Sequence, residues 1–188
     1  NVFGWTAKEP RAFDTLDACL EAGCNTIDTA DIYSVFVPGH KGGESETVIG
    51  RWMRRGVQRD RVIILTKVGM EMAPGKTGLS RAHILACVEE SLRRLQTDYI
   101  DVYFAHQDDP KTPLEETLST FAQLVEQDKV RAIGASNYSG ARLREALDVS
   151  ARLGVPRYEL LQPHYNLYQR EEYERDLEAL CTQEQLGV

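Results

Sequence analysis

The sequence predicts an α/β fold built on a parallel β-sheet. Segments with apolar residues at helical spacing alternate regularly with short, strongly apolar segments that are typical of buried strands. No linker, internal repeat or low-complexity tract divides the sequence, so we treat residues 1–188 as a single domain. Strands that alternate with helices imply right-handed βαβ crossovers, which build either an open doubly wound sheet or a (β/α)₈ barrel.

The N-terminal half of the chain contains three predicted helices and two predicted strands. The first helix ends at Gly23, a residue suited to a helix C-terminus, and residues 24–28 form a short strand. Residues 62–65 indicate a strand that is buried on both faces. The third helix begins after Ser80, a residue type favoured at the N-cap. The apolar positions that define the helices are Phe13, Leu16 and Leu20 in the first, Val48, Ile49, Trp52 and Met53 in the second, and Ile84, Leu85, Val88, Leu92 and Leu95 in the third.

The C-terminal half continues the same alternation. One helix opens with Thr112-Pro113-Leu114-Glu115, the pattern of a capping box with proline at the first helical position. A later helix ends at Gly154, and a sixth helix begins at about Glu171. The remaining predicted elements are strands over residues 99–104, 129–135 and 158–162, and a helix over residues 140–153.

Composition and charge exclude several classes of function. The content of 42% hydrophobic and 27% charged residues is typical of a soluble globular domain, and the longest apolar runs are of strand length, too short to cross a membrane. The net charge is −7, from 22 basic and 29 acidic residues, and the scattered arginines argue against nucleic-acid binding. The four cysteines lack the paired spacing of zinc ligands, and we expect buried or half-buried thiols in a reducing, cytoplasmic setting.

Polar side chains stand at the end of every predicted strand. In parallel β/α folds, functional side chains gather at the C-terminal ends of the strands, because the loops there are free to vary. Any one of these residues alone is most often a turn residue or a solvated side chain. Together they predict a functional site at one rim of the sheet. In chain order they are Asp28, Lys67, His106, the pair Ser136-Asn137, and Gln162.

Four residues near this rim predict proton-transfer chemistry. Lys67 and Asp28 end neighbouring strands and are close enough to pair, which keeps the Lys67 ammonium charged. Tyr33 lies five residues after Asp28, so its hydroxyl could reach the ammonium. That cation is expected to lower the pKa of Tyr33 by two or three units, which corresponds to about 3 to 4 kcal/mol. His106 would hydrogen-bond a substrate carbonyl oxygen as a neutral ring donor.

Six motifs together resemble those of the aldo-keto reductases, including their voltage-gated potassium channel β-subunit branch. They are GCNTIDTADIY, ESETVIGRW, ILTKVG, YIDVYFAHQDD, GASNYS and LLQPHYNLYQR. The resemblance covers nearly the whole chain and implies a (β/α)₈ TIM barrel that binds a nicotinamide cofactor, usually NADPH, with NADH not excluded. The family uses no Rossmann GxGxxG motif, and the sequence contains none. Because a full barrel has eight strands, we expect an incomplete barrel that lacks the first strand and the C-terminal strands 7 and 8.

The resemblance also implies a role for each residue of the site. Tyr33 is the general acid, Lys67 and Asp28 tune its acidity, and His106 orients the carbonyl group. A second set contacts the nicotinamide carboxamide or the cofactor pocket around it, with the first residue of the chain as a weaker candidate. These expected cofactor-binding residues are Ser136, Asn137, Gln162, Asp28 and Asn1.

The loops around the predicted site depart from the family pattern. Many relatives have Tyr-Gly where this chain has Tyr33-Ser34, followed by a long loop that reaches Glu44, so the relatives' substrates do not transfer. Trp5 and Val35 are candidates for lining the substrate mouth, although packing is the commoner role of such residues. The family's pocket for the 2′-phosphate is expected beyond residue 188, so the preference for NADPH over NADH depends on the resemblance alone.

The predicted function is carbonyl reduction, in which hydride passes from the nicotinamide to an aldehyde or ketone and Tyr33 supplies the proton. The expected partner is a small carbonyl substrate, with no role for nucleic acid or a membrane. One alternative is a nicotinamide-binding, redox-sensing regulatory subunit with little turnover. Another is a Schiff-base lyase with Lys67 as nucleophile, which Asp28 disfavours because it should keep Lys67 protonated. The sequence does not specify the substrate, the direction of the reaction or the oligomeric state.

Overall fold

Residues 2–188 are described by the computed structural model, so the cofactor role predicted for Asn1 lies outside the described residues. Five strands alternate with helices in the order that the sequence predicts. The strands are β1 Thr26–Asp28, β2 Ile63–Val68, β3 Ile100–Ala105, β4 Val130–Ser136 and β5 Leu160–Gln162. The helices are α1 Glu9–Glu21, α2 Glu44–Met53, α3 Arg81–Leu95, α4 Leu114–Glu126, α5 Gly140–Leu153 and α6 Glu178–Glu184, with the 3₁₀ turn η1 Arg59–Arg61 before β2 and the π-helical turn η2 Tyr173–Leu177 before α6.

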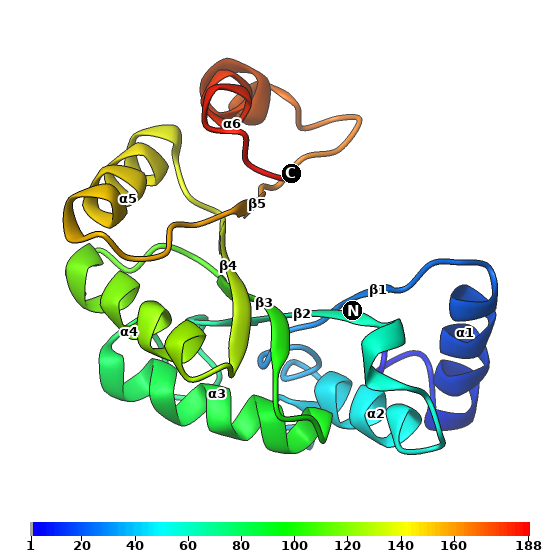
Figure 1. Cartoon of the computed structure of the whole chain (residues 1–188). Coiled ribbons are helices and arrows are strands. Elements are labelled where there is room, and N and C mark those ends of the chain that lie inside the picture. Colours follow the sequence, from blue (N-terminus) through cyan, green and yellow to red (C-terminus); the bar gives the residue numbers. More distant parts are fainter. Residues whose placement is uncertain (1) are drawn as a thin grey trace.

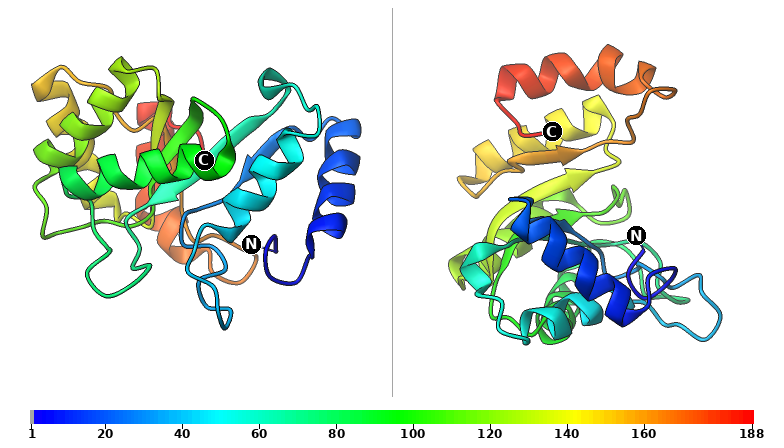
Figure 2. Two further views of the ribbon diagram at one scale, coloured as in Figure 1. Left: turned by 90° about the horizontal axis from the view of Figure 1, so that it is seen from below. Right: turned by 90° about the vertical axis from the view of Figure 1, so that its right-hand side faces the viewer.

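All five strands run parallel in one sheet, in the order β1-β2-β3-β4-β5. The sheet curls into an open crescent, and the helices lie along its outer side (Figure 1; Figure 2). Gly187 pairs in parallel with Leu160, so the chain returns to the sheet beside β5. Sequential parallel strands with outer helices are the topology of a (β/α) barrel, which confirms the predicted fold class over the described residues.

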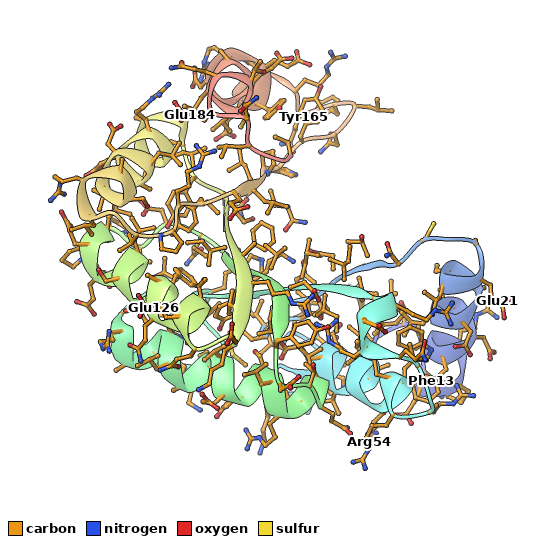
Figure 3. All side chains as sticks on the ribbon, viewed as in Figure 1. Phe13, Glu21, Arg54, Glu126, Tyr165 and Glu184 are labelled. Carbon is orange, nitrogen blue, oxygen red and sulfur yellow. The ribbon has the colours of Figure 1, made fainter. Side chains whose placement is uncertain are left out.

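The two ends of the crescent come from opposite ends of the chain. Helix α1, with Phe13 and Glu21, forms one end, and the region around α6, with Tyr165 and Glu184, forms the other (Figure 3). The predicted helix from Glu171 is present and contains the π-helical turn before α6. The barrel wall between these ends is therefore made of β1 to β5 and of the helices that connect them.

Apolar side chains pack on both faces of the sheet. Successive residues of a strand point to opposite faces, and β3 illustrates the result. Tyr103 faces the helix layer and packs edge-on against Phe121 of α4, with ring centroids 5.7 Å apart. Phe104 faces the barrel interior and lies against Gly134 of β4, where any Cβ would collide with the ring. Both aromatic residues are fully buried, so β3 is held from inside and outside.

Helix termini follow the predictions in part. Ser139 caps α5 by accepting a bond from the Arg142 backbone N–H, and Gly154 ends the same helix in the left-handed conformation. The predicted capping box of α4 is wrong, because the Thr112 hydroxyl donates to Asp109 Oδ2 at 2.7 Å and Pro113 stands at the N-cap. Ser80 does occupy the N-cap of α3, but its side chain makes no capping bond there.

The cysteines are distributed differently from the expectation. Cys87 and Cys181 are buried, whereas Cys19 of α1 and Cys24, in the turn before β1, are exposed. No helix among residues 2–188 is long and apolar enough to cross a membrane. Within the same range, no three His, Cys, Asp or Glu side chains are grouped so that they could hold a metal ion.

Candidate active site

The C-terminal ends of the strands bring the predicted site residues to one rim. Asp28 and Ser136 are the last residues of β1 and β4, and Gln162 is the last residue of β5. Lys67 is the penultimate residue of β2, and His106 directly follows β3. The curl of the sheet lets side chains from the first and last of these strands meet at this rim, where the Gln162 amide donates to Asp28 Oδ1 at 3.2 Å.

Lys67 is the centre of the cluster. Its side chain is only 1% exposed, and its ammonium donates to Asp28 Oδ1 at 2.6 Å, to the Thr29 carbonyl at 2.7 Å and to Tyr33 Oη at 3.1 Å. An ammonium has three N–H donors, so these three acceptors satisfy it completely. The predicted convergence of Asp28, Tyr33 and Lys67 is therefore present as direct hydrogen bonds.

Tyr33 belongs to the loop over residues 29–43 that rises from β1. Its hydroxyl donates to Asp28 Oδ2 at 3.3 Å. Burial, and then the negative charge and hydrogen bond of Asp28, raise the pKa of Tyr33 above its ordinary value. The prediction that Lys67 lowers the pKa of Tyr33 is therefore wrong for this arrangement. The physical reason is that burial disfavours tyrosinate, and that the Asp28 carboxylate, which Tyr33 shares with Lys67, disfavours it further.

The ionisation of Lys67 follows the opposite balance. Burial lowers the pKa of Lys67, and the Asp28 carboxylate offsets only part of that shift. The sequence correctly predicts the partner and the two opposing effects, but it underestimates the burial. Asp28 itself keeps 37% of its side chain exposed, so the pair sits at the boundary between the buried wall and the open rim.

His106 faces the same space from β3. Its ring lies edge-on to that of Tyr33, with centroids 5.9 Å apart. Burial, and then the positive charge of Lys67, lower the pKa of His106 to about 4, so the ring is neutral at physiological pH as predicted. The buried Nδ1 atom has no hydrogen-bond partner in the described part of the chain. A neutral imidazole with unused hydrogen-bonding capacity can serve a ligand.

The residues predicted to hold the cofactor are joined by hydrogen bonds. The Ser136 hydroxyl donates to the Gln162 carbonyl at 2.8 Å, and the Asn137 amide donates to the His106 carbonyl at 2.8 Å and to Ser136 Oγ at 3.1 Å. Gln162 Oε1 is buried and lacks a partner among residues 2–188. An unused carbonyl oxygen beside hydroxyl and amide groups fits a ligand that carries a carboxamide, because such a ligand both donates and accepts.

Two residues of the loop after β1 were not predicted as part of the site. The carbonyl oxygen of Thr29 binds the Lys67 ammonium, and its hydroxyl donates to Ser45 Oγ at 2.8 Å. Asp31, in the same loop, is fully buried. Backbone acceptors carry no residue-specific signal, so Thr29 could not have been found from its side chain, whereas a second acid in the motif DTAD was a visible signal for Asp31.

The residues expected near the substrate mouth lie in two loops that contact each other. Trp5 is 52% exposed and packs edge-on against Phe36, which is 56% exposed, with ring centroids 5.0 Å apart. Val35, which directly precedes Phe36, is half-buried. The Ser34 hydroxyl donates to the Phe3 carbonyl at 3.0 Å, so the first loop and the loop after β1 are held together. The exposed apolar contact at this rim therefore comes from Phe36 and not from Val35.

The described chain is a curled parallel β/α sheet whose C-terminal rim gathers a hydrogen-bonded cluster of acidic, basic and phenolic groups. Comparison with known proteins gives the family: the model of the aldo/keto reductase family matches residues 2–188, and the chain belongs to that family.

Its relatives carry two kinds of description. The chain is 38% identical over 165 residues to aldo-keto reductase YhdN of Bacillus subtilis, covering 87% of this chain and 46% of the relative. It is 34% identical over 210 residues to aldo-keto reductase AFTS1 of Alternaria alternata, covering 98% and 55%. It is 34% identical over 183 residues to a rice protein described as a probable voltage-gated potassium channel subunit beta, covering 96% and 53%. The chain thus spans about half the length of the curated relatives it matches.

Proposed function

We propose that the protein is an NADP(H)-dependent carbonyl reductase that transfers hydride from the nicotinamide to an aldehyde or ketone, with Tyr33 as the general acid. The observation that carries the proposal is the shared contact of three groups. Lys67 Nζ lies 2.6 Å from Asp28 Oδ1 and 3.1 Å from Tyr33 Oη. The neutral ring of His106 is beside them. Membership of the aldo/keto reductase family supports the same reaction class.

When bound, the reduced nicotinamide supplies a hydride, which carries two electrons to the carbonyl carbon. His106 hydrogen-bonds the carbonyl oxygen and so orients the group and stabilises the charge that develops on it. Tyr33 donates its proton to that oxygen and becomes tyrosinate. Its raised pKa keeps the proton in place until the oxygen becomes an alkoxide, which is a stronger base than tyrosinate. The Lys67 ammonium at 3.1 Å then stabilises the tyrosinate.

The cofactor is assigned to the hydrogen-bonded set at the ends of β4 and β5. Ser136, Asn137 and Gln162 would hold the nicotinamide carboxamide, and the unused Gln162 Oε1 supports this role. Asp28 borders the same space through its bond to the Gln162 amide. NADPH is the proposed cofactor, and the substrate is a small carbonyl compound. A cytoplasmic location is proposed from the four unpaired thiols, since disulfides are rare there.

A second candidate is a nicotinamide-binding regulatory subunit with little turnover. The observation that favours it is the similarity to the rice relative described as a probable channel subunit beta. The lyase alternative is weakened by the contacts of Lys67, because all three of its N–H donors are engaged and a Schiff base needs a free, neutral amine.

The proposed reductase is tested on the full-length protein. Oxidation of NADPH and NADH is followed against a panel of aldehydes and ketones for the wild type, for Tyr33→Phe and for Tyr99→Phe. Tyr99 is a matched control because it lies just before β3, at the opposite end of that strand from His106. We expect Tyr33→Phe to lose about a hundredfold or more in rate and Tyr99→Phe to keep the rate. Wild-type rates in Tyr33→Phe would exclude Tyr33 as the acid, and tight cofactor binding without turnover would favour the regulatory subunit.

A further inference from the structure

Asp31 is a buried acid for which the proposed reaction has no use. It lies in the loop over residues 29–43, called the catalytic loop below, three residues after Asp28 and two before Tyr33. Its side chain is fully buried, and both carboxyl oxygens lack a hydrogen-bond partner within residues 2–188. An isolated carboxylate in such a place costs several kcal/mol, and a protein avoids that cost by pairing the group or by keeping its proton. Which of the two applies depends on the charges around Asp31.

The charged groups around Asp31 come from three elements. Glu46 of α2 is fully buried, accepts from the Thr66 hydroxyl at 2.6 Å and pairs with Arg94 of α3 at 2.6 Å. Arg94 also binds Glu90 at 3.2 Å and Ser91 at 3.2 Å. Lys67 of β2 is the other nearby cation, and its three donors are taken by Asp28, Thr29 and Tyr33. Both cations are therefore already paired with other acids.

Two further titratable groups face Asp31 and offer no positive charge. Tyr103 of β3 is fully buried, and burial and then an Asp31 charge raise its pKa. Cys87 of α3 is also buried, and burial and then an Asp31 charge raise its pKa to about 12. The Ile32 N–H lies near enough to favour the Asp31 carboxylate but outside hydrogen-bond geometry. Burial and then the charge of Glu46 raise the pKa of Asp31 to about 8. Because both carboxyl oxygens lack partners and both nearby cations are paired with other acids, the protonated form of Asp31 is favoured near neutral pH.

The position of Asp31 links this carboxyl to the catalytic groups. Its backbone N–H donates to the Lys67 carbonyl at 3.3 Å, and the Tyr33 N–H donates to the Ala30 carbonyl at 3.2 Å. At the far end of the same loop, a Cβ on Gly42 would come within 2.9 Å of the Asp31 carbonyl, so the loop packs closely on itself. A shift of Asp31 would therefore move the turn that leads from Asp28 to Tyr33.

We infer that Asp31 is a positioning residue whose protonated, buried carboxyl holds the catalytic loop in place, and that loss of this proton displaces the loop and disables the site. Once ionised, the carboxylate is repelled by Glu46 and drawn towards water, and it takes its neighbours Asp28 and Tyr33 away from Lys67. The inference rests on the proposed function for its effect on catalysis. The state of the carboxyl and the movement of the loop do not depend on that function.

The first test uses the full-length protein without cofactor or substrate. Infrared spectroscopy with carboxyl-labelled aspartate should show a protonated-acid band at pH 6 that disappears with a midpoint near pH 8 and is missing in Asp31→Asn. Hydrogen exchange in residues 29–33 should be faster above pH 8 in the wild type than in Asp31→Asn at the same pH. Exposed Asp60, changed to Asn, is the matched control and should leave band and exchange unaltered. If Asp31→Asn does not fold, the wild-type band decides alone: its absence at pH 6 overturns the inference.

The second test follows the rate of carbonyl reduction from pH 6 to pH 10. The wild type and Asp60→Asn should lose activity about tenfold per pH unit above pH 8, and Asp31→Asn should lack this decline. The lowered pKa of Lys67 makes it the other source of an alkaline decline, so an unchanged decline in Asp31→Asn would assign it to Lys67 and overturn the role of Asp31. A protein that shows the band and the exchange difference but reduces no carbonyl would contradict the proposed function and leave Asp31 as the positioning residue of the loop.

Discussion

Two ion pairs, one at each end of the parallel strands, have the same length and different surroundings. At the C-terminal rim, Lys67 Nζ lies 2.6 Å from Asp28. At the N-terminal base, Arg59 Nη2 lies 2.6 Å from Asp101. Arg59 also donates to Thr97 and to two backbone carbonyls, and its guanidinium stacks on the Tyr99 ring at 3.9 Å.

The charged groups at the base have hydrogen-bond partners, whereas polar atoms at the rim keep unused hydrogen-bonding capacity. Asp101 binds Arg59, Arg131 and the Ile64 N–H, and Arg131 covers the second face of the Tyr99 ring at 3.8 Å. At the rim, His106 Nδ1 and Gln162 Oε1 have no partner in the described chain. In β/α barrels the base carries stability and the rim carries function. The difference teaches that the length of an ion pair does not reveal its role, but its surroundings do.

The sharpest test of this contrast is Lys67→Met. Removal of the rim cation is expected to slow carbonyl reduction about a hundredfold to ten-thousandfold, because the tyrosinate left after proton transfer loses its counter-charge. The free energy of unfolding should change by less than about 1 kcal/mol, because Asp28 is partly exposed and water can solvate it. Steady-state rates and urea unfolding of the full-length protein measure the two effects. A stability loss with unchanged rates would make the rim pair structural.

The reciprocal change at the base is Asp101→Asn. It leaves the Arg59 guanidinium, only 18% exposed, without its carboxylate, and it weakens the bonds to Arg131 and Ile64. We expect a loss of about 3 kcal/mol in the free energy of unfolding. The reduction rate per folded molecule should stay the same, since the base is remote from Tyr33. Urea unfolding followed by assay below the transition measures both, and a selective loss of rate would contradict the division between base and rim.

The sequence predicted the residues that meet at the rim, but not the ion pair at the base. Asp28, Lys67 and His106 stand at strand ends, and parallel strands must bring such positions to one edge. The base cluster left no comparable signal. Arg59 lies in a 3₁₀ turn before β2, and its partner Asp101 is the second residue of β3, so only the paired strands place them together. Pairing of side chains from separate elements is a property of the tertiary fold.

Two of the errors made from the sequence involve a neighbouring carboxylate. Local patterns predicted a capping bond from Thr112 and a lowered pKa for Tyr33. In both cases a carboxylate three or five residues away accepts the hydrogen bond, and burial adds the larger part of the raised pKa of Tyr33. Asp109 accepts from Thr112, and Asp28 accepts from Tyr33. Local motifs state what a side chain can do, but competition among acceptors is decided by distances that appear only on folding.

The pH dependence of stability sharpens the comparison at His106. Its pKa falls from an ordinary 6.5 to about 4, mainly through burial, so between these values the folded state binds fewer protons than the unfolded state. Stability is therefore complete above about pH 6.5 and is lost as the pH falls to 4, by about 3 kcal/mol at 1.36 kcal/mol per unit. Thermal unfolding at half-unit steps from pH 4 to pH 7 measures this loss. His106→Asn should remove this part of the slope, and an equal slope in both proteins would contradict a buried neutral ring.

The smallest effect is expected at an ion pair that belongs to neither cluster. Arg51 of α2 lies 2.8 Å from Glu9 of α1, close to the length of the other two pairs, but the two side chains are 58% and 39% exposed. Water and salt screen such a pair, so Arg51→Gln should change the free energy of unfolding by less than about 0.5 kcal/mol and leave the reduction rate unaltered. Three pairs of nearly equal length would then differ in effect according to burial and surroundings. A loss from Arg51→Gln as large as that from Asp101→Asn would show that the contact itself, and not its burial, sets the contribution.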